Sequence, residues 1–132
     1  MTSDAFEAAV ASAYDPSETL YVVAFADSPS DPSRYLLLQR TSQPEEQDVT
    51  LGQNTYHVEW CGQERSTYGG IEAFFLGTSS AQVVFTPQAA AALGDLEELS
   101  VTFMLSAEEY EALRQALEGI FAGTGRLAVA GA

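Results

Sequence analysis

The chain holds a single histidine, His57, and a single cysteine, Cys61, so a thiol nucleophile with an imidazole base requires this pair. If both residues lie on one extended strand, four residues at about 3.3 Å each separate them by roughly 13 Å. A base must come within roughly 3 Å of its nucleophile, so the spacing argues against a dyad unless the chain bends at Cys61 and Gly62. A small hydrolase that uses His57 or Cys61 with nearby carboxylates is therefore an alternative interpretation.

Other catalytic and metal-binding motifs are missing from the sequence. A serine triad needs the same single histidine, there is no Gly-x-Ser-x-Gly elbow, and a phosphate-binding P-loop requires the lysine that this chain lacks. Residues 27–31 resemble a calcium loop only in their acidity, because Pro29 and Pro32 stand where such a loop requires Asp or Asn and Gly. A pair of carboxylates such as Glu59 and Glu64 could flank a glycosidic bond, as in a glycosidase. Among 19 acidic residues such pairs arise by chance, so this pair is no evidence for an active site. We therefore expect no catalytic residue, no metal and no cofactor.

The charge of the chain points to one class of partner. Five arginines and 19 acidic residues give a formal net charge of −14, which repels the phosphates of nucleic acids and anionic membrane surfaces. We therefore expect binding to neither nucleic acid nor membrane. A basic protein is the partner that this charge favours, and an acidic surface that only keeps the protein in solution is the alternative.

Several features predict a cytoplasmic protein. Cys61 has no second cysteine to pair with, so no internal disulfide can form. The first basic residue is Arg34, which leaves the first 14 residues without the positive segment of a secretory signal. The longest wholly apolar run, Leu20–Ala26, has seven residues, whereas a spanning helix needs roughly 20.

Two β-rich runs predict the centre of the fold. Leu20–Ala26 and residues 34–40 flank a polar loop, which is typical of a hairpin. Both runs are apolar on both faces, so we expect strands that are covered on each side. In residues 54–60, by contrast, apolar and polar side chains alternate, which places His57 and Glu59 on the solvent-exposed face of a half-buried strand.

Further elements follow from alternation and capping signals. Strands are predicted over residues 49–51, 71–76, 81–86 and 99–105, and helices over residues 4–13, 87–93 and from 107 onward. Thr86-Pro87 begins the second helix, and a capping box of Ser106 and Glu109 begins the third. The apolar stripe of the third helix predicts that it packs on one face of a sheet.

These elements predict an α+β fold: a largely antiparallel sheet of six or seven strands, a C-terminal helix on one face, and one or two short helices. We expect a variable N-terminal segment with a short helix over residues 1–17, one α+β domain over residues 18–123, and a flexible tail over residues 124–132. The pair Gly69-Gly70 predicts a tight turn or a close backbone approach, and its functional interpretation is a loop that offers Tyr68 to a partner.

The order of these segments resembles the immunity protein 10 family, small cytoplasmic antidotes encoded in bacterial polymorphic-toxin gene clusters. The likeness spans roughly residues 18–123. It is carried by Tyr21–Phe25, Tyr35–Arg40, Gln47-Asp48, Tyr56 with Val58, Tyr68–Ile71, Leu93-Gly94 and Ile120–Gly123.

The resemblance implies a mostly β fold, no catalysis, and inhibition of a cognate toxin by direct binding. It supplies no contact residues. From the charge pattern we expect a basic toxin to be bound by acids on loops and on the wet strand face, with one aromatic anchor: Glu45, Glu46, Asp48, Glu59, Glu64 and Tyr68. Arg40 and Asp48 are expected to form an internal ion pair. An acidic adaptor or chaperone for an effector protein is a third interpretation.

Overall fold

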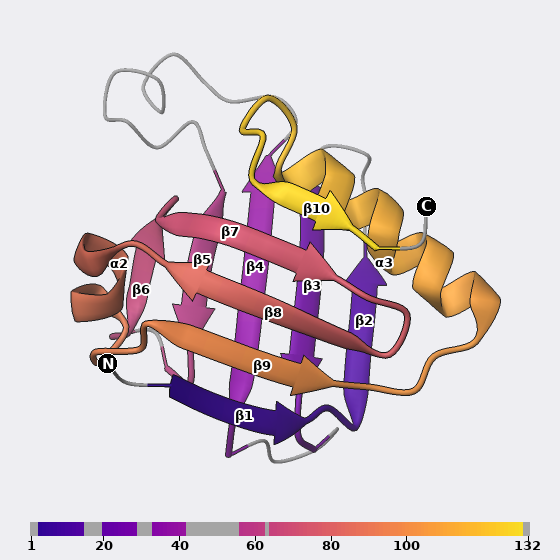
Figure 1. The fold of residues 1–132 in the computed structure, drawn as a ribbon, viewed down its shortest axis with the longest axis horizontal. Helices are drawn as coiled ribbons and strands as arrows, with labels where there is room; N and C mark the ends of the chain where they lie inside the picture. Colours follow the sequence, from indigo (N-terminus) through magenta and orange to yellow (C-terminus); the bar gives the residue numbers. More distant parts are fainter. Residues whose placement is uncertain (1–2, 15–19, 29–32, 42–55, 63, 131–132) are drawn as a thin grey trace.

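The computed structural model describes residues 3–14, 20–28, 33–41, 56–62 and 64–130. Within these ranges the chain forms two five-stranded sheets that face each other, with their strands crossing at a large angle (Figure 1). The predicted α+β fold, with a C-terminal helix and a short helix, is confirmed. The strands are more numerous than expected and divide between two sheets, because the chain changes sheet twice.

The first sheet has the strand order β1-β9-β8-β7-β10. Its strands are β1 (Ser3–Glu7), β7 (Ile71–Leu76), β8 (Ser80–Phe85), β9 (Glu98–Thr102) and β10 (Leu127–Val129). The three central strands are antiparallel, whereas the edge strands β1 and β10 run parallel to their neighbours. β10 lies within the predicted flexible tail, so this part of the expectation is wrong for Leu127–Val129.

The second sheet has the order β2-β3-β4-β5-β6 and is antiparallel throughout. Its strands are β2 (Val10–Tyr14), β3 (Leu20–Ala26), β4 (Tyr35–Thr41), β5 (His57–Trp60) and β6 (Ser66–Tyr68). The predicted hairpin is confirmed as β3 and β4. The strand predicted around residues 49–51 lies outside the described residues.

The helix predicted over residues 4–13 is wrong, because this segment forms β1 and β2. The chain crosses between the sheets at Ala8 and Ala9, whose backbone N atoms donate to Thr102 O (2.7 Å) and Ala26 O (2.8 Å). Phe6 is buried against Trp60, with ring centroids 6.1 Å apart. These partners are distant in sequence, and tertiary pairing of this kind overrides local helix propensity.

The second crossing, from β6 to β7, uses Gly69 and Gly70, with φ values of 70° and 90°. Gly69 N donates to Tyr56 O (2.7 Å), and a Cβ on Gly70 would lie 2.4 Å from the Cβ of Ala89. Ala89 belongs to α2 (Pro87–Ala92), which is capped by Thr86 as predicted. The tight turn with a close approach is therefore confirmed.

The core lies between the sheets and is apolar. The rings of Phe25 and Phe103 stack across it with centroids 5.9 Å apart. No polar or charged residue within the described ranges is buried. Because the inner positions of each strand are filled by large apolar side chains, the sandwich is held by removal of apolar area from water.

Helix α3 (Ala107–Ile120) begins with the predicted capping box of Ser106 and Glu109 and buries its apolar stripe. It closes the gap between the sheets at the inner side of β2, β3 and β4. A Cβ on Gly119 would lie 2.7 Å from the ring of Tyr21, which measures how closely helix and sheet approach. Arg40 Nη1 donates to Ile120 O (2.9 Å) and Ala122 O (2.8 Å), so a cation holds the negative end of the helix.

Of the described elements, both helices lie on the inner side of the second sheet or at its ends, and neither covers its outer face (Figure 1). Val22, Ala24 and Leu37 are only half-buried there, whereas Val23 and Leu36 are fully buried. The expectation that β3 and β4 are covered on both sides is therefore wrong. Their outward residues are apolar without being enclosed.

Replacing Gly70 by Ala should lower the free energy of unfolding by roughly 3 kcal/mol, from left-handed strain plus the collision with Ala89. Gly123→Ala is the matched control, because its φ is 79° and nothing lies within 4 Å of the added atom. The control should cost about 1 kcal/mol. Denaturant unfolding measures both, and equal losses would refute a packing role for Gly70.

Candidate functional site

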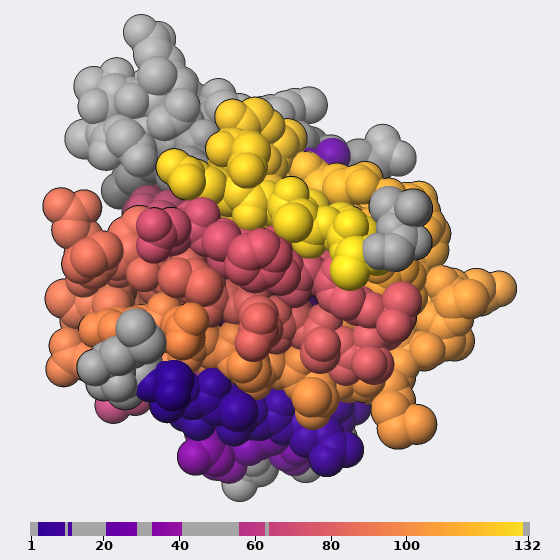
Figure 2. Space-filling view, in the orientation of Figure 1, coloured from indigo at the N-terminus to yellow at the C-terminus, as the bar shows by residue number. Residues whose placement is uncertain are grey.

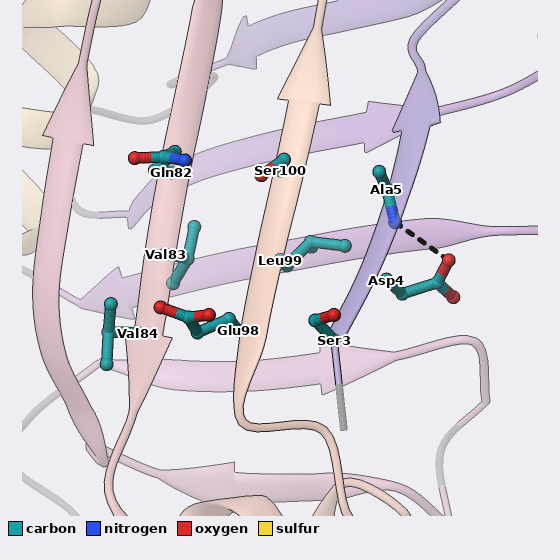
Figure 3. A pocket seen from close by; sticks show the side chains of 9 residues that line it. All are labelled: Ser3, Asp4, Ala5, Gln82, Val83, Val84, Glu98, Leu99 and Ser100. Carbon is teal, nitrogen blue, oxygen red and sulfur yellow. Dashed lines mark hydrogen bonds between the residues drawn. The ribbon is translucent and has the colours of Figure 1, made fainter. Parts of the chain in front are cut away.

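The outer face of the first sheet carries two shallow hollows. Figure 2 shows this face, on which β7, β8, β9 and β1 form a continuous surface. One hollow of about 360 Å³ lies over β8, β9 and β1, as Figure 3 shows. It is lined by Ser3, Asp4, Ala5, Gln82, Val83, Val84, Glu98, Leu99 and Ser100. The other, of about 390 Å³, borders Phe75. Neither is lined by His57 or Cys61, so neither combines a nucleophile with an imidazole base.

The outer face of the second sheet has a different chemistry. The strand register sets Leu37 opposite Glu59, and His57 opposite Tyr68, so that these side chains stand on neighbouring strands of one face. Tyr35 stands on the same face of β4, two residues before Leu37. We call these five residues, Tyr35, Leu37, His57, Glu59 and Tyr68, the outer patch.

Within the outer patch, the hydroxyl of Tyr35 donates to Glu59 Oε2 at 2.5 Å. This hydrogen bond to the carboxylate, together with desolvation, raises the pKa of Tyr35 from 10.0 to about 12. The phenol therefore stays protonated at neutral pH and fixes the direction of the carboxylate.

His57 and Tyr68 form the second contact of the outer patch. Their ring centroids are 4.9 Å apart in an edge-on arrangement. The Nδ1 atom of His57 is buried without a hydrogen-bond partner, whereas Tyr68 is 47% exposed. The histidine therefore supports an accessible tyrosine ring.

Cys61 has the wrong surroundings for a nucleophile. It follows β5 with a φ of 57°, and its thiol contacts Tyr35 O at 3.8 Å. Burial raises the pKa of the Cys61 thiol, whereas reactive thiols have a lowered pKa. The arrangement therefore favours binding over nucleophilic chemistry at this site.

Asp27, the first acidic residue after β3, forms hydrogen bonds within its own loop. Asp27 accepts hydrogen bonds from the backbone N (3.0 Å) and the hydroxyl (2.9 Å) of Ser33. Backbone hydrogen bonding at Arg34 is the largest influence that lowers the pKa of Asp27. In the part of the chain that is described, no group of three or more potential metal ligands occurs.

The structure brings two of the predicted contact residues together. Glu59 and Tyr68 share the outer face of the second sheet, and Glu64 lies exposed in the turn between β5 and β6. Glu45, Glu46 and Asp48 lie outside the described residues. The expected pair of Arg40 with Asp48 also falls there, and Arg40 instead donates to the end of α3.

Sequence reasoning missed Tyr35 and Leu37 as members of this surface. Both lie in a run that is apolar at every position from 35 to 38, so the pattern gives no sign of which side faces outward. The hydroxyl of Tyr35 was the signal that could have indicated an outward position, because a buried hydroxyl requires a hydrogen-bond partner.

A family model described as immunity protein 10 matches residues 7–111. The chain belongs to the immunity protein 10 family. The match begins at the last residue of β1 and ends in the early turns of α3, so it includes most of both sheets. No curated protein and no solved structure matches the chain. The resemblance stated from sequence is thus confirmed, and with it the immunity-protein role.

None of the helices in the described parts of this immunity protein is long and apolar enough to cross a membrane.

Glu59→Gln should lower the pKa of Tyr35 from about 12 toward 10.0, because it removes the carboxylate that disfavours phenolate. In the wild type, the Tyr35 hydrogen bond stabilises the fold fully below pH 10 and is lost as the pH rises through about 12. Phenolate absorbance during alkaline titration measures the change, with Tyr35→Phe identifying which transition belongs to this residue. An unchanged titration in Glu59→Gln would contradict the assignment.

Proposed function

We propose that this immunity protein neutralises a cognate bacterial toxin by binding it directly, without chemistry of its own. The family match over residues 7–111 carries the proposal. The setting of Cys61 and the open, aromatic outer face of the second sheet support binding as the mode of action. We further propose that the protein acts in the bacterial cytoplasm as part of a polymorphic-toxin system.

The charge distribution supports a basic toxin as partner. Two of the five arginines form ion pairs with acids in the described part of the chain. Arg34 pairs with Asp4 (3.2 Å), and Arg114 pairs with Glu111 and with Glu118 (2.6 Å). The other acids in the described ranges stay at the surface, since no charged residue there is buried. A net charge of −14 therefore attracts a cationic protein over a distance and speeds encounter.

The contact residues that we propose are those expected from sequence. Glu45, Glu46, Asp48 and Glu64 steer the toxin, while Glu59 and Tyr68 make close contact. Close contact is assigned to Glu59 and Tyr68 because Glu59 is held by Tyr35 and Tyr68 presents an accessible ring. Steering charges change the association rate, whereas close contacts change the dissociation rate.

Co-expression with the toxin encoded by the adjacent gene should restore growth and yield a complex that co-purifies. Cys61→Ala should protect equally well, because neutralisation by binding requires no thiol. Toxin that stays lethal and unbound would contradict the proposal. A bound toxin that stays fully active would instead indicate an adaptor or chaperone, and catalytic destruction of the toxin would indicate a hydrolase.

Changing Glu45, Glu46 and Glu64 together to Gln should slow association a few-fold at low salt and flatten its salt dependence, because long-range attraction is screened by salt. Stopped-flow association across a salt series measures both effects. A variant with Glu72, Glu98 and Glu108 changed to Gln removes the same charge from other sites and should slow association less. An unchanged rate in the first variant would remove steering by these acids from the account.

A further inference from the structure

We propose that the outer patch is the surface that seats on the toxin, and that Glu59 receives an arginine side chain of the toxin between the rings of Tyr35 and Tyr68. This inference rests on the proposed function and names the contact that it requires.

The first support is the accessibility and shape of the face. α2 contacts Gly70 at the crossing between sheets, and α3 packs against Tyr21 on the inner side, so neither helix covers the outward residues of β4 and β5. Paired strands hold those residues in a fixed spacing. A partner therefore meets a preformed surface, and little ordering is needed on binding.

The second support is that Glu59 stands among uncharged residues at the outward positions of these strands. Among the described outward residues of β3 to β6, Glu59 is the only acid, and no arginine is present. These residues are Val22, Ala24, Ala26, Tyr35, Leu37, Gln39, His57, Glu59, Ser66 and Tyr68. A cation from the partner is the complement to such a carboxylate.

The third support is the acceptor capacity of Glu59. A carboxylate has about four acceptor positions, and Tyr35 donates to Oε2 alone, so a two-pronged donor can still be accommodated. The guanidinium of arginine supplies two parallel N–H groups and stacks on aromatic faces, whereas lysine offers a compact, strongly hydrated charge. Tyr68, 47% exposed, and the ring of Tyr35 favour arginine for this reason.

Two other arrangements fit the surface less well. A second copy of this chain would also carry a charge of −14 and would bring two Glu59 carboxylates toward each other. On the first sheet, the exposed Phe75 and Glu98 lie on β7 and β9, but the strands of that sheet carry no tyrosine, so none of their carboxylates is held by a phenol hydroxyl as Glu59 is. Among the described strands, the outer patch therefore joins a carboxylate held by one tyrosine to a face that also presents the exposed ring of Tyr68.

The experiment compares variants of the outer patch with matched variants of the first sheet, with the toxin encoded by the adjacent gene as the probe. Glu59→Gln and Tyr68→Ala should each weaken the dissociation constant by about tenfold or more, mainly through faster dissociation. Glu98→Gln makes the same charge change on the opposite face. Phe75→Ala removes a ring that is 49% exposed, close to the 47% of Tyr68. Both controls should stay within about twofold, the scale of near-neutral contacts.

Double-mutant cycles then identify the toxin residue. Each surface arginine of the toxin is changed to Gln and measured against wild type and Glu59→Gln. One arginine should lose most of its effect in the Glu59→Gln background, because the two groups share one interaction. Unfolding curves of all variants confirm that the fold is kept.

The outcomes separate this inference from the proposed function. If the wild type binds the toxin but the controls weaken binding as much as the patch variants do, the outer patch is not the contact surface. If the patch variants weaken binding but no toxin arginine couples to Glu59, the arginine assignment is wrong. If the wild type binds no toxin, the proposed function fails, and this inference fails with it.

Discussion

The ring of Phe121 lies between the two sheets, with its centroid 5.0 Å from that of Tyr56 and 5.4 Å from that of Phe74. One side chain at the end of α3 thus joins the second sheet to the first. Tyr56 adds a hydrogen bond, since its hydroxyl accepts from the backbone N of Ile71 (3.0 Å). These contacts fix which side of each strand turns inward, and the outward residues then follow from the alternation of a β-strand. The arrangement of the outer patch therefore depends on residues that are buried between the sheets.

The elements that could be predicted from sequence are those with local causes. The capping box at Ser106 and the Thr86-Pro87 start depend on residues within one turn, and both helices begin where expected. The structure of residues 4–13 has no such local cause, because nothing in their composition reveals that β1 pairs with β9, about 95 positions later. The three-residue strand β10 is equally dependent on a distant neighbour, β7. Long-range pairing decides such segments, and local propensity does not.

The same distinction applies to the candidate site. Alternation placed His57 and Glu59 on one face of their strand, and the paired glycines drew attention to Tyr68. Their proximity to Tyr35 depends on how β4 and β5 are aligned, which no short-range pattern encodes. In residues 35–38 every side chain is apolar or aromatic, so inward and outward positions look alike until the core is formed. The carboxylate was foreseeable as an exposed acid, whereas the tyrosine that holds it was not.

On β5 the outward Glu59 stands between the buried residues Val58 and Trp60, and on β4 Leu37 stands between Leu36 and Leu38. Outward-facing residues thus alternate along each strand with residues that belong to the core. Substitutions at outward positions can therefore change the surface without disturbing the core, and under the proposed function they would let the protein keep pace with a toxin whose sequence diverges. Adaptation of this kind would proceed by isolated codon changes and would leave the interior untouched.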